Sequence, residues 1–106
     1  MVVRPTLKMS KINKLSVRIC ADTIPDDSEL EPGYLYVSEK YRTAVHLCAC
    51  GCGNKVVTPI KPWGWSLELS VADTGETEAT LRPSIGSFNL CCKSHYFITR
   101  NKVIWV

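Results

Sequence analysis

Five of the six cysteines in this chain of 106 residues lie in two clusters, and these clusters restrict how the chain can fold. Three of them occupy alternate positions in "CACGC", residues 48–52, and two stand side by side at 91 and 92. A histidine accompanies each cluster, His46 before the first and His95 after the second. Thiolate sulfur and imidazole nitrogen are the usual ligands of zinc in proteins. We therefore expect one metal ion to bring these two distant stretches together.

The spacing of the first cluster excludes a straight strand. Sulfur ligands of tetrahedral zinc lie about 3.8 Å apart, whereas alternate residues of a strand are about 6.5 Å apart. The chain must therefore curl, and Gly51 and Gly53 can adopt the positive φ that a curl requires. Neighbouring residues of a strand point to opposite sides, so we expect only one residue of the second cluster to bind. The predicted ligands are Cys48, Cys50, Cys52 and Cys92, with His46 or His95 as the alternative to one of them.

Other interpretations of the cysteines are reduced thiols in a hydrophobic core and disulfides. Cys20 lies far from both clusters and is interpreted as an ordinary buried thiol. A zinc ion held by four thiolates has no open coordination position, so such a site is structural. Any chemistry must then come from other residues.

Charge and hydropathy narrow the class of protein. The formal net charge is only +3, without a dense basic cluster near the aromatic residues, so we do not expect nucleic-acid binding. No stretch resembles a signal peptide or reaches the roughly 18 apolar residues of a membrane helix. These features predict a cytoplasmic protein that does not bind membranes, in a compartment where thiols stay reduced.

We expect a single domain over residues 1–106, with three regions of different charge. Residues 1–20 form a basic N-terminal strand or arm, residues 21–33 an exposed acidic connector, and residues 34–106 a zinc-bound β core. Within the arm, "KLSVRIC" has the alternation of an edge strand. The alternative role for the arm is a docking surface for an acidic partner.

The pattern from residue 34 onward is typical of β-structure. "WSLELSV", residues 65–71, alternates apolar and polar side chains with the period of a half-buried strand. Further strands are predicted at "YLYVS", "RTAVHLC", "KVVTPI" and "TEATLRP", with a turn at "DTGE" and a terminal hairpin in "HYFITRNKVIWV". The predicted fold class is mainly β, a small twisted sheet or partly open barrel stapled by one zinc knuckle, with little helix.

One serine stands out as a candidate nucleophile. Ser84 follows a predicted strand, and a turn there can direct backbone N–H groups at an oxyanion. Serine needs a neighbouring base, usually histidine, and a shared metal would bring His46 and His95 near each other. Ser87 and Ser94 are the rival nucleophiles.

Four stretches together resemble a known family: "PGYLYVS", "HLCACGCG", "LRPSIGSFNLCCKSHYFI" and the final "KVIWV". They resemble the small bacterial domain-of-unknown-function family 6527 over residues 32–106. Members of that family are encoded beside ubiquitin-like proteins and their activating and conjugating enzymes. Two departures are Ala49, where proline is expected, and the additional Cys91.

The resemblance implies a serine-type peptidase or esterase that removes or matures a bacterial ubiquitin-like modifier. It implies catalytic Ser84 and His95, with His46 as base or orienting group, and zinc at the cysteines. The expected mechanism adds the modifier's extended tail to a sheet edge as a strand, with an oxyanion held by the backbone N–H groups of Ile85 and Gly86. The alternatives are a zinc-stapled adaptor without catalysis and a zinc hydrolase with histidine ligands.

Overall fold

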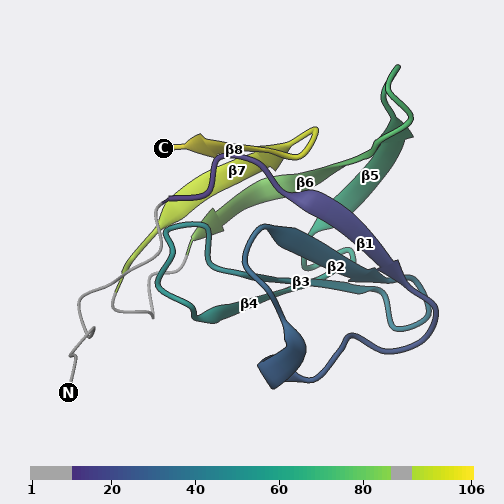
Figure 1. Cartoon of the computed structure of the whole chain (residues 1–106), viewed down its shortest axis with the longest axis horizontal. Helices are drawn as coiled ribbons and strands as arrows, with labels where there is room; N and C mark the ends of the chain where they lie inside the picture. The colour runs from purple at the N-terminus through teal and green to yellow at the C-terminus, as the bar shows by residue number, and fades with distance from the viewer. Residues whose placement is uncertain (1–10, 87–91) are drawn as a thin grey trace.

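The computed structural model describes residues 11–86 and 92–106, and over these residues the fold is mainly β. Two four-stranded sheets face each other without forming a closed barrel (Figure 1). The helical structure in the described residues is one 3-10 turn, η1 (Asp27–Glu29). No helix in this part of the chain has the length and hydropathy needed to cross a membrane. The strands are β1 (Ser16–Cys20), β2 (Tyr34–Ser38), β3 (Thr43–Leu47), β4 (Lys55–Pro59), β5 (Ser66–Val71), β6 (Thr77–Gly86), β7 (His95–Thr99) and β8 (Lys102–Trp105).

The hydrophobic core lies between the two sheets, and each sheet contributes the side chains on its inner face. From the sheet β5-β6-β7-β8, Leu81 and Ile98 pair across β6 and β7, and both are buried. From the sheet β1-β2-β3-β4, Leu35 and Val37 meet them. The predicted strands therefore form because their apolar positions share one face.

Residues 13–15 link the two sheets before β1 begins. The Leu15 N–H donates to the Asn101 carbonyl at 2.8 Å, and Lys14 forms an isolated antiparallel bridge with Lys102 of β8. The chain then continues into β1, which pairs in parallel with β2 at the edge of the other sheet. Leu15 is 1% exposed, so this segment also contributes to the core.

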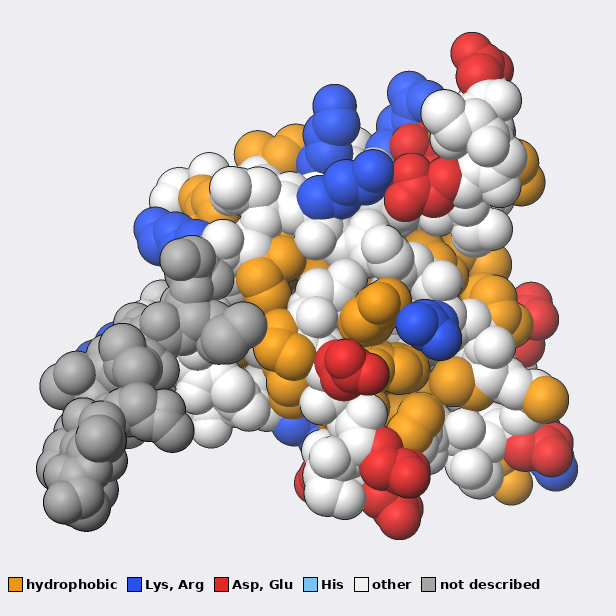
Figure 2. Space-filling model, in the orientation of Figure 1, with side chains coloured by type: hydrophobic (Ala, Val, Ile, Leu, Met, Phe, Trp, Pro, Cys, Tyr) orange, Lys and Arg blue, Asp and Glu red, His pale blue; other side chains and the backbone are white. Residues whose placement is uncertain are grey.

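The sequence suggested an exposed acidic connector between β1 and β2, but in the structure this connector is partly buried. Leu30 is buried in a second small cluster with Tyr36 and Val45, on the side of the sheet away from the main core. The Glu31 N–H donates to the Tyr36 hydroxyl at 3.0 Å, and Asp27 pairs with Lys55 at 2.7 Å. Figure 2 shows acidic side chains gathered over the segment around η1. The connector therefore covers part of the outer face of this sheet.

Strand β6 is longer than expected because it passes through a bulge. Leu81 pairs with Ile98 and Ile85 with Tyr96, so four residue steps on β6 match two on β7. Pro83 lies inside this bulge and has no N–H to donate to a ladder. Bulges of this kind re-aim side chains and are common next to active sites.

The predicted terminal hairpin is β7-β8, and its turn lies at Arg100 and Asn101. Both residues have positive φ, 48° and 70°, which is the requirement of a two-residue type I′ turn. Asn101 is fully buried and anchors the turn with its side chain. Its Oδ1 accepts from the Ala79 N–H at 2.7 Å, and its Nδ2 donates to the Thr77 carbonyl at 2.9 Å.

Candidate active site and metal centre

The β6-β7 register directs Ser84 and His95 to the same face of their sheet. Ile85 pairs with Tyr96, and Gly86 pairs with His95. Ile85 and Tyr96 are buried in the core, at 2% and 0% exposure. Because side chains alternate along a strand, Ser84 and His95 must point to the opposite, outer face.

Ser84 and His95 form a hydrogen bond, Oγ to Nε2, of 2.8 Å. Both side chains are only partly buried, so a substrate can reach them. The expected position of Ser84 in a loop after a strand is wrong, because β6 continues through the bulge to Gly86. A serine hydroxyl within hydrogen-bond reach of an imidazole is the arrangement that activates serine as a nucleophile.

The two expected oxyanion donors differ in direction. The Val106 N–H donates to the His95 carbonyl at 3.1 Å, so His95 directs its backbone polar groups toward β8. Its register partner Gly86 then directs its own N–H away from β7. The neighbouring Ile85 directs its N–H at β7, opposite Tyr96. Of the two, only Gly86 has an N–H on the side that a substrate can approach.

The edge of β6 near Ser84 has no partner strand in the described part of the chain. The pairing of β5 with β6 ends at Ser66 and Arg82, while β6 continues to Gly86. Figure 1 shows β6 extending past the start of β5. Backbone groups of residues 83–86 on this side are therefore open for pairing with an extended peptide.

The four cysteines proposed as metal ligands converge. The sulfur atoms of Cys48, Cys50, Cys52 and Cys92 all lie within 4.8 Å of one another. The Cys48 and Cys92 sulfurs are 3.8 Å apart, the separation of two ligands on a tetrahedral zinc ion. Residues 48–53 form the knuckle, and its chain curls at Gly51 and Gly53, whose φ values of 90° and 85° match the expectation. This donor set fits a zinc ion that has no open position.

Burial acts against ionisation at all four cysteines, but hydrogen bonds lower the thiol pKa at two of them, Cys50 and Cys92. Burial acts against the ionisation of Cys92, but the hydroxyl and backbone N–H of Ser94 lower the pKa of its thiol to about 6. Burial raises the pKa of the Cys52 thiol to about 12. Asn54 donates to the Cys52 sulfur from its side chain at 3.2 Å. Such donors orient metal ligands and stabilise thiolates.

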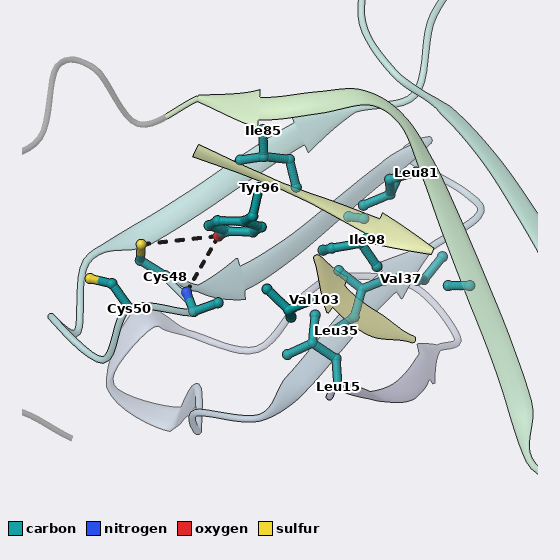
Figure 3. Packing of buried hydrophobic residues seen from close by; sticks show 13 residues of the cluster. Leu15, Leu35, Val37, Cys48, Cys50, Leu81, Ile85, Tyr96, Ile98 and Val103 are labelled. Atoms are coloured by element: carbon teal, nitrogen blue, oxygen red, sulfur yellow. Dashed lines mark hydrogen bonds between the residues drawn. The ribbon is translucent and has the colours of Figure 1, made fainter. Parts of the chain in front are cut away.

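His46 lies in the core, away from Ser84. Its Nε2 is 2.6 Å from the hydroxyl of Tyr96, and no hydrogen bond joins it to Ser84 within the described residues. Burial lowers the pKa of His46 to about 4, so the imidazole is neutral near pH 7. The Tyr96 hydroxyl also accepts from the Ala49 N–H at 3.3 Å and lies 4.0 Å from the Cys48 sulfur. Figure 3 shows Tyr96 directed at this end of the knuckle.

The structure also locates the remaining candidates. Ser94, a rival nucleophile, is buried beside the cysteines, whereas Ser87 and Cys91 lie outside the described residues. Cys20 is half-buried rather than buried. Neither histidine belongs to the cysteine group among the described residues, so the geometry does not favour a zinc hydrolase with histidine ligands.

The sequence comparison agrees with this geometry. Residues 20–106 match the family model for BubE, the bacterial ubiquitination-like system serine protease. The chain belongs to the BubE family. This membership confirms the expected association with a bacterial ubiquitin-like system, while the family number stays a prediction. No curated protein and no solved structure matches the chain.

Proposed function

We propose that this protein is a serine peptidase or esterase that removes or matures a bacterial ubiquitin-like modifier. One observation carries the proposal: a Ser84–His95 hydrogen bond of 2.8 Å in a chain of a serine protease family. Ser84 is the nucleophile and His95 is the base. We assign His46 to the support of the site through Tyr96 rather than to proton transfer, because its imidazole contacts the Tyr96 hydroxyl.

The reaction begins when the modifier's tail lies along the open edge of β6. The Nε2 atom of His95 takes the Ser84 proton as Oγ attacks the carbonyl carbon at the end of the modifier. The Gly86 N–H stabilises the developing oxyanion, a contribution of about 3 kcal/mol per donor. His95 then gives the proton to the leaving group, and water hydrolyses the acyl-enzyme to release the modifier and restore Ser84.

The proposed metal has a structural role and takes no part in the reaction. Cys48, Cys50, Cys52 and Cys92 would hold one zinc ion, whose role is to fix the knuckle against the segment that leads into β7. Cys92 stands three residues before His95, so the position of the base depends on the closed knuckle. Because four thiolates fill the coordination sphere, zinc supplies no activated water.

The proposed partners are the ubiquitin-like protein and its activating and conjugating enzymes. The proposed location is the cytoplasm, where four clustered thiols remain reduced and available for metal. The adaptor alternative shares these partners and differs only in lacking turnover.

The decisive experiment uses the ubiquitin-like protein encoded beside this one, extended at its C-terminus by a short peptide. Intact mass spectrometry should show loss of the extension with the parent protein and none with Ser84→Ala. Ser70→Ala, an exposed serine on β5, is the matched control and should cleave normally. Full cleavage by Ser84→Ala would refute the assignment, and tight binding without cleavage by the parent would favour the adaptor.

A further inference from the structure

A cationic cleft lies next to Ser84 on the outer face of the β5-β8 sheet. Its volume is about 520 Å³. Pro83 and Phe97 line the end of the cleft near Ser84, and Lys61 and Arg82 are the charged residues of its lining. A pocket with two cations and no lining carboxylate is electrostatically suited to an anionic group.

Neither cation has an ion-pair partner among residues 11–86 and 92–106. Ion pairs in the described residues involve Lys14, Lys40, Lys55 and Arg100, and none involves Lys61 or Arg82. Both side chains are exposed. Lys61 Nζ lies over the Trp63 ring, 5.6 Å from its centroid, and this contact leaves its charge in place. Two cations without a carboxylate partner therefore raise the positive potential of the cleft.

One wall of the cleft is the loop of residues 60–65, whose backbone hydrogen bonds fix its conformation. The Gly64 N–H donates to the Lys61 carbonyl, and the Trp65 N–H to the Pro59 carbonyl, each at 2.8 Å. A Cβ at Gly64 would collide with the Pro59 carbonyl oxygen, so only glycine fits there. The loop presents Trp63 at 80% exposure next to the cleft residues Pro62 and Gly64. An exposed tryptophan beside a cleft is typical of a recognition surface.

The position of His95 indicates which part of a substrate enters this cleft. His95 lines a second cleft, which also contains Trp105 and Val106. The base must protonate the leaving group, so the leaving group passes over that second cleft. The acyl part, which stays bonded to Ser84, then lies toward Pro83 and the cationic cleft.

We propose that the cationic cleft is the subsite for the modifier's tail and that it selects a tail with an acidic side chain close to the scissile bond. Arg82 and Lys61 contact the carboxylate, Phe97 and Trp63 contact apolar atoms of the tail, and the β6 edge holds its backbone. The inference rests on the proposed function for its substrate and adds a specificity that family membership does not contain.

The test uses synthetic peptides that end in a glycine aminomethylcoumarin amide and carry Glu, Gln or Lys at successive upstream positions. We expect kcat/KM to be about fivefold higher for the best Glu peptide than for its Gln counterpart, the effect of about 1 kcal/mol from one partly exposed charge pair. Arg82→Glu should reverse the preference in favour of Lys. Arg100→Glu, at an exposed arginine in the β7-β8 turn, should keep the preference for Glu.

Binding separates this inference from the proposed function. Fluorescence anisotropy with Ser84→Ala and the same sequences as labelled peptides should give the same order of affinity, because recognition does not need the nucleophile. Equal affinity for Glu, Gln and Lys peptides would overturn the subsite even if the parent hydrolyses them. A retained preference for Glu, with neither hydrolysis nor fluorophosphonate labelling of Ser84, would support the subsite and reject the enzyme.

Discussion

Replacing Tyr96 by phenylalanine tests how the core supports the site. The change keeps the aromatic ring, whose centroid lies 5.0 Å from that of Trp105, and removes only the hydroxyl. That hydroxyl is the hydrogen-bond partner of His46 Nε2 at 2.6 Å and of the Ala49 N–H at 3.3 Å. Both partner residues are fully buried. The substitution therefore isolates the polar contribution of one atom.

The magnitude follows from the two groups left without a partner. A buried polar group that loses its partner costs about 1–3 kcal/mol. With two such groups, one at the longer distance of 3.3 Å, we expect the free energy of unfolding to fall by about 2–4 kcal/mol. Because Ala49 belongs to the knuckle, we also expect a chelator to remove the metal faster.

Equilibrium unfolding in urea measures this loss. Tyr41→Phe, at a tyrosine that is 54% exposed, is the matched control and should change stability by less than about 0.5 kcal/mol. In the double variant with His46→Leu, the second substitution should cost less than it does alone, because one unpaired group has been removed. A Tyr96→Phe protein within about 0.5 kcal/mol of the parent would refute the reasoning.

Three further substitutions test other parts of the structure. Cys50→Ser should lower the bound metal below one ion per chain in native mass spectrometry, and an unchanged metal content, or an equal loss in Cys20→Ser, would argue against the proposed ligands. Asn101→Gly keeps the positive φ but removes two side-chain hydrogen bonds, one buried and one partly buried, so thermal unfolding should show a loss of about 2–3 kcal/mol, and an unchanged Tm would contradict this role. Gly64→Ala should distort the loop beside the cationic cleft and raise KM more than it lowers kcat; a change confined to kcat would speak against a binding role for the loop.

The positions of the strands were largely predictable from sequence, although their burial was not: β5 alternates as a half-buried strand should but is mostly exposed, and β2 is buried on both faces. "YLYVS" corresponds to β2 and "WSLELSV" to β5 within one residue. Alternation indicates which side chains share a face of a strand, but it does not state which strand lies beside it. The division into two sheets and the parallel pairing of β1 with β2 therefore needed the structure.

The site was predictable where covalent spacing or ligand geometry limited the choices. Alternating cysteines with Gly51 among them and Gly53 after them could meet one ion only by curling, and the structure contains that curl. The separate place of His46 was not evident, because proximity in sequence to a metal ligand does not fix the direction of a side chain. Tyr96 was missed although alternation next to His95 makes it a core position, where a phenol needs a polar partner.

Residues 13–15 pair with the start of β8, and β1, which follows them, pairs with β2. This arrangement has a practical consequence for N-terminal truncation of the protein. The family match begins only at residue 20, so a shortened version with that boundary would lack Leu15 and the whole of β1 up to its final residue. Backbone groups of both β2 and β8 would then lose their hydrogen-bond partners and be exposed to water. Exposed strand edges of this kind pair with other chains, and we expect the trimmed protein to precipitate or self-associate while the chain of 106 residues does not.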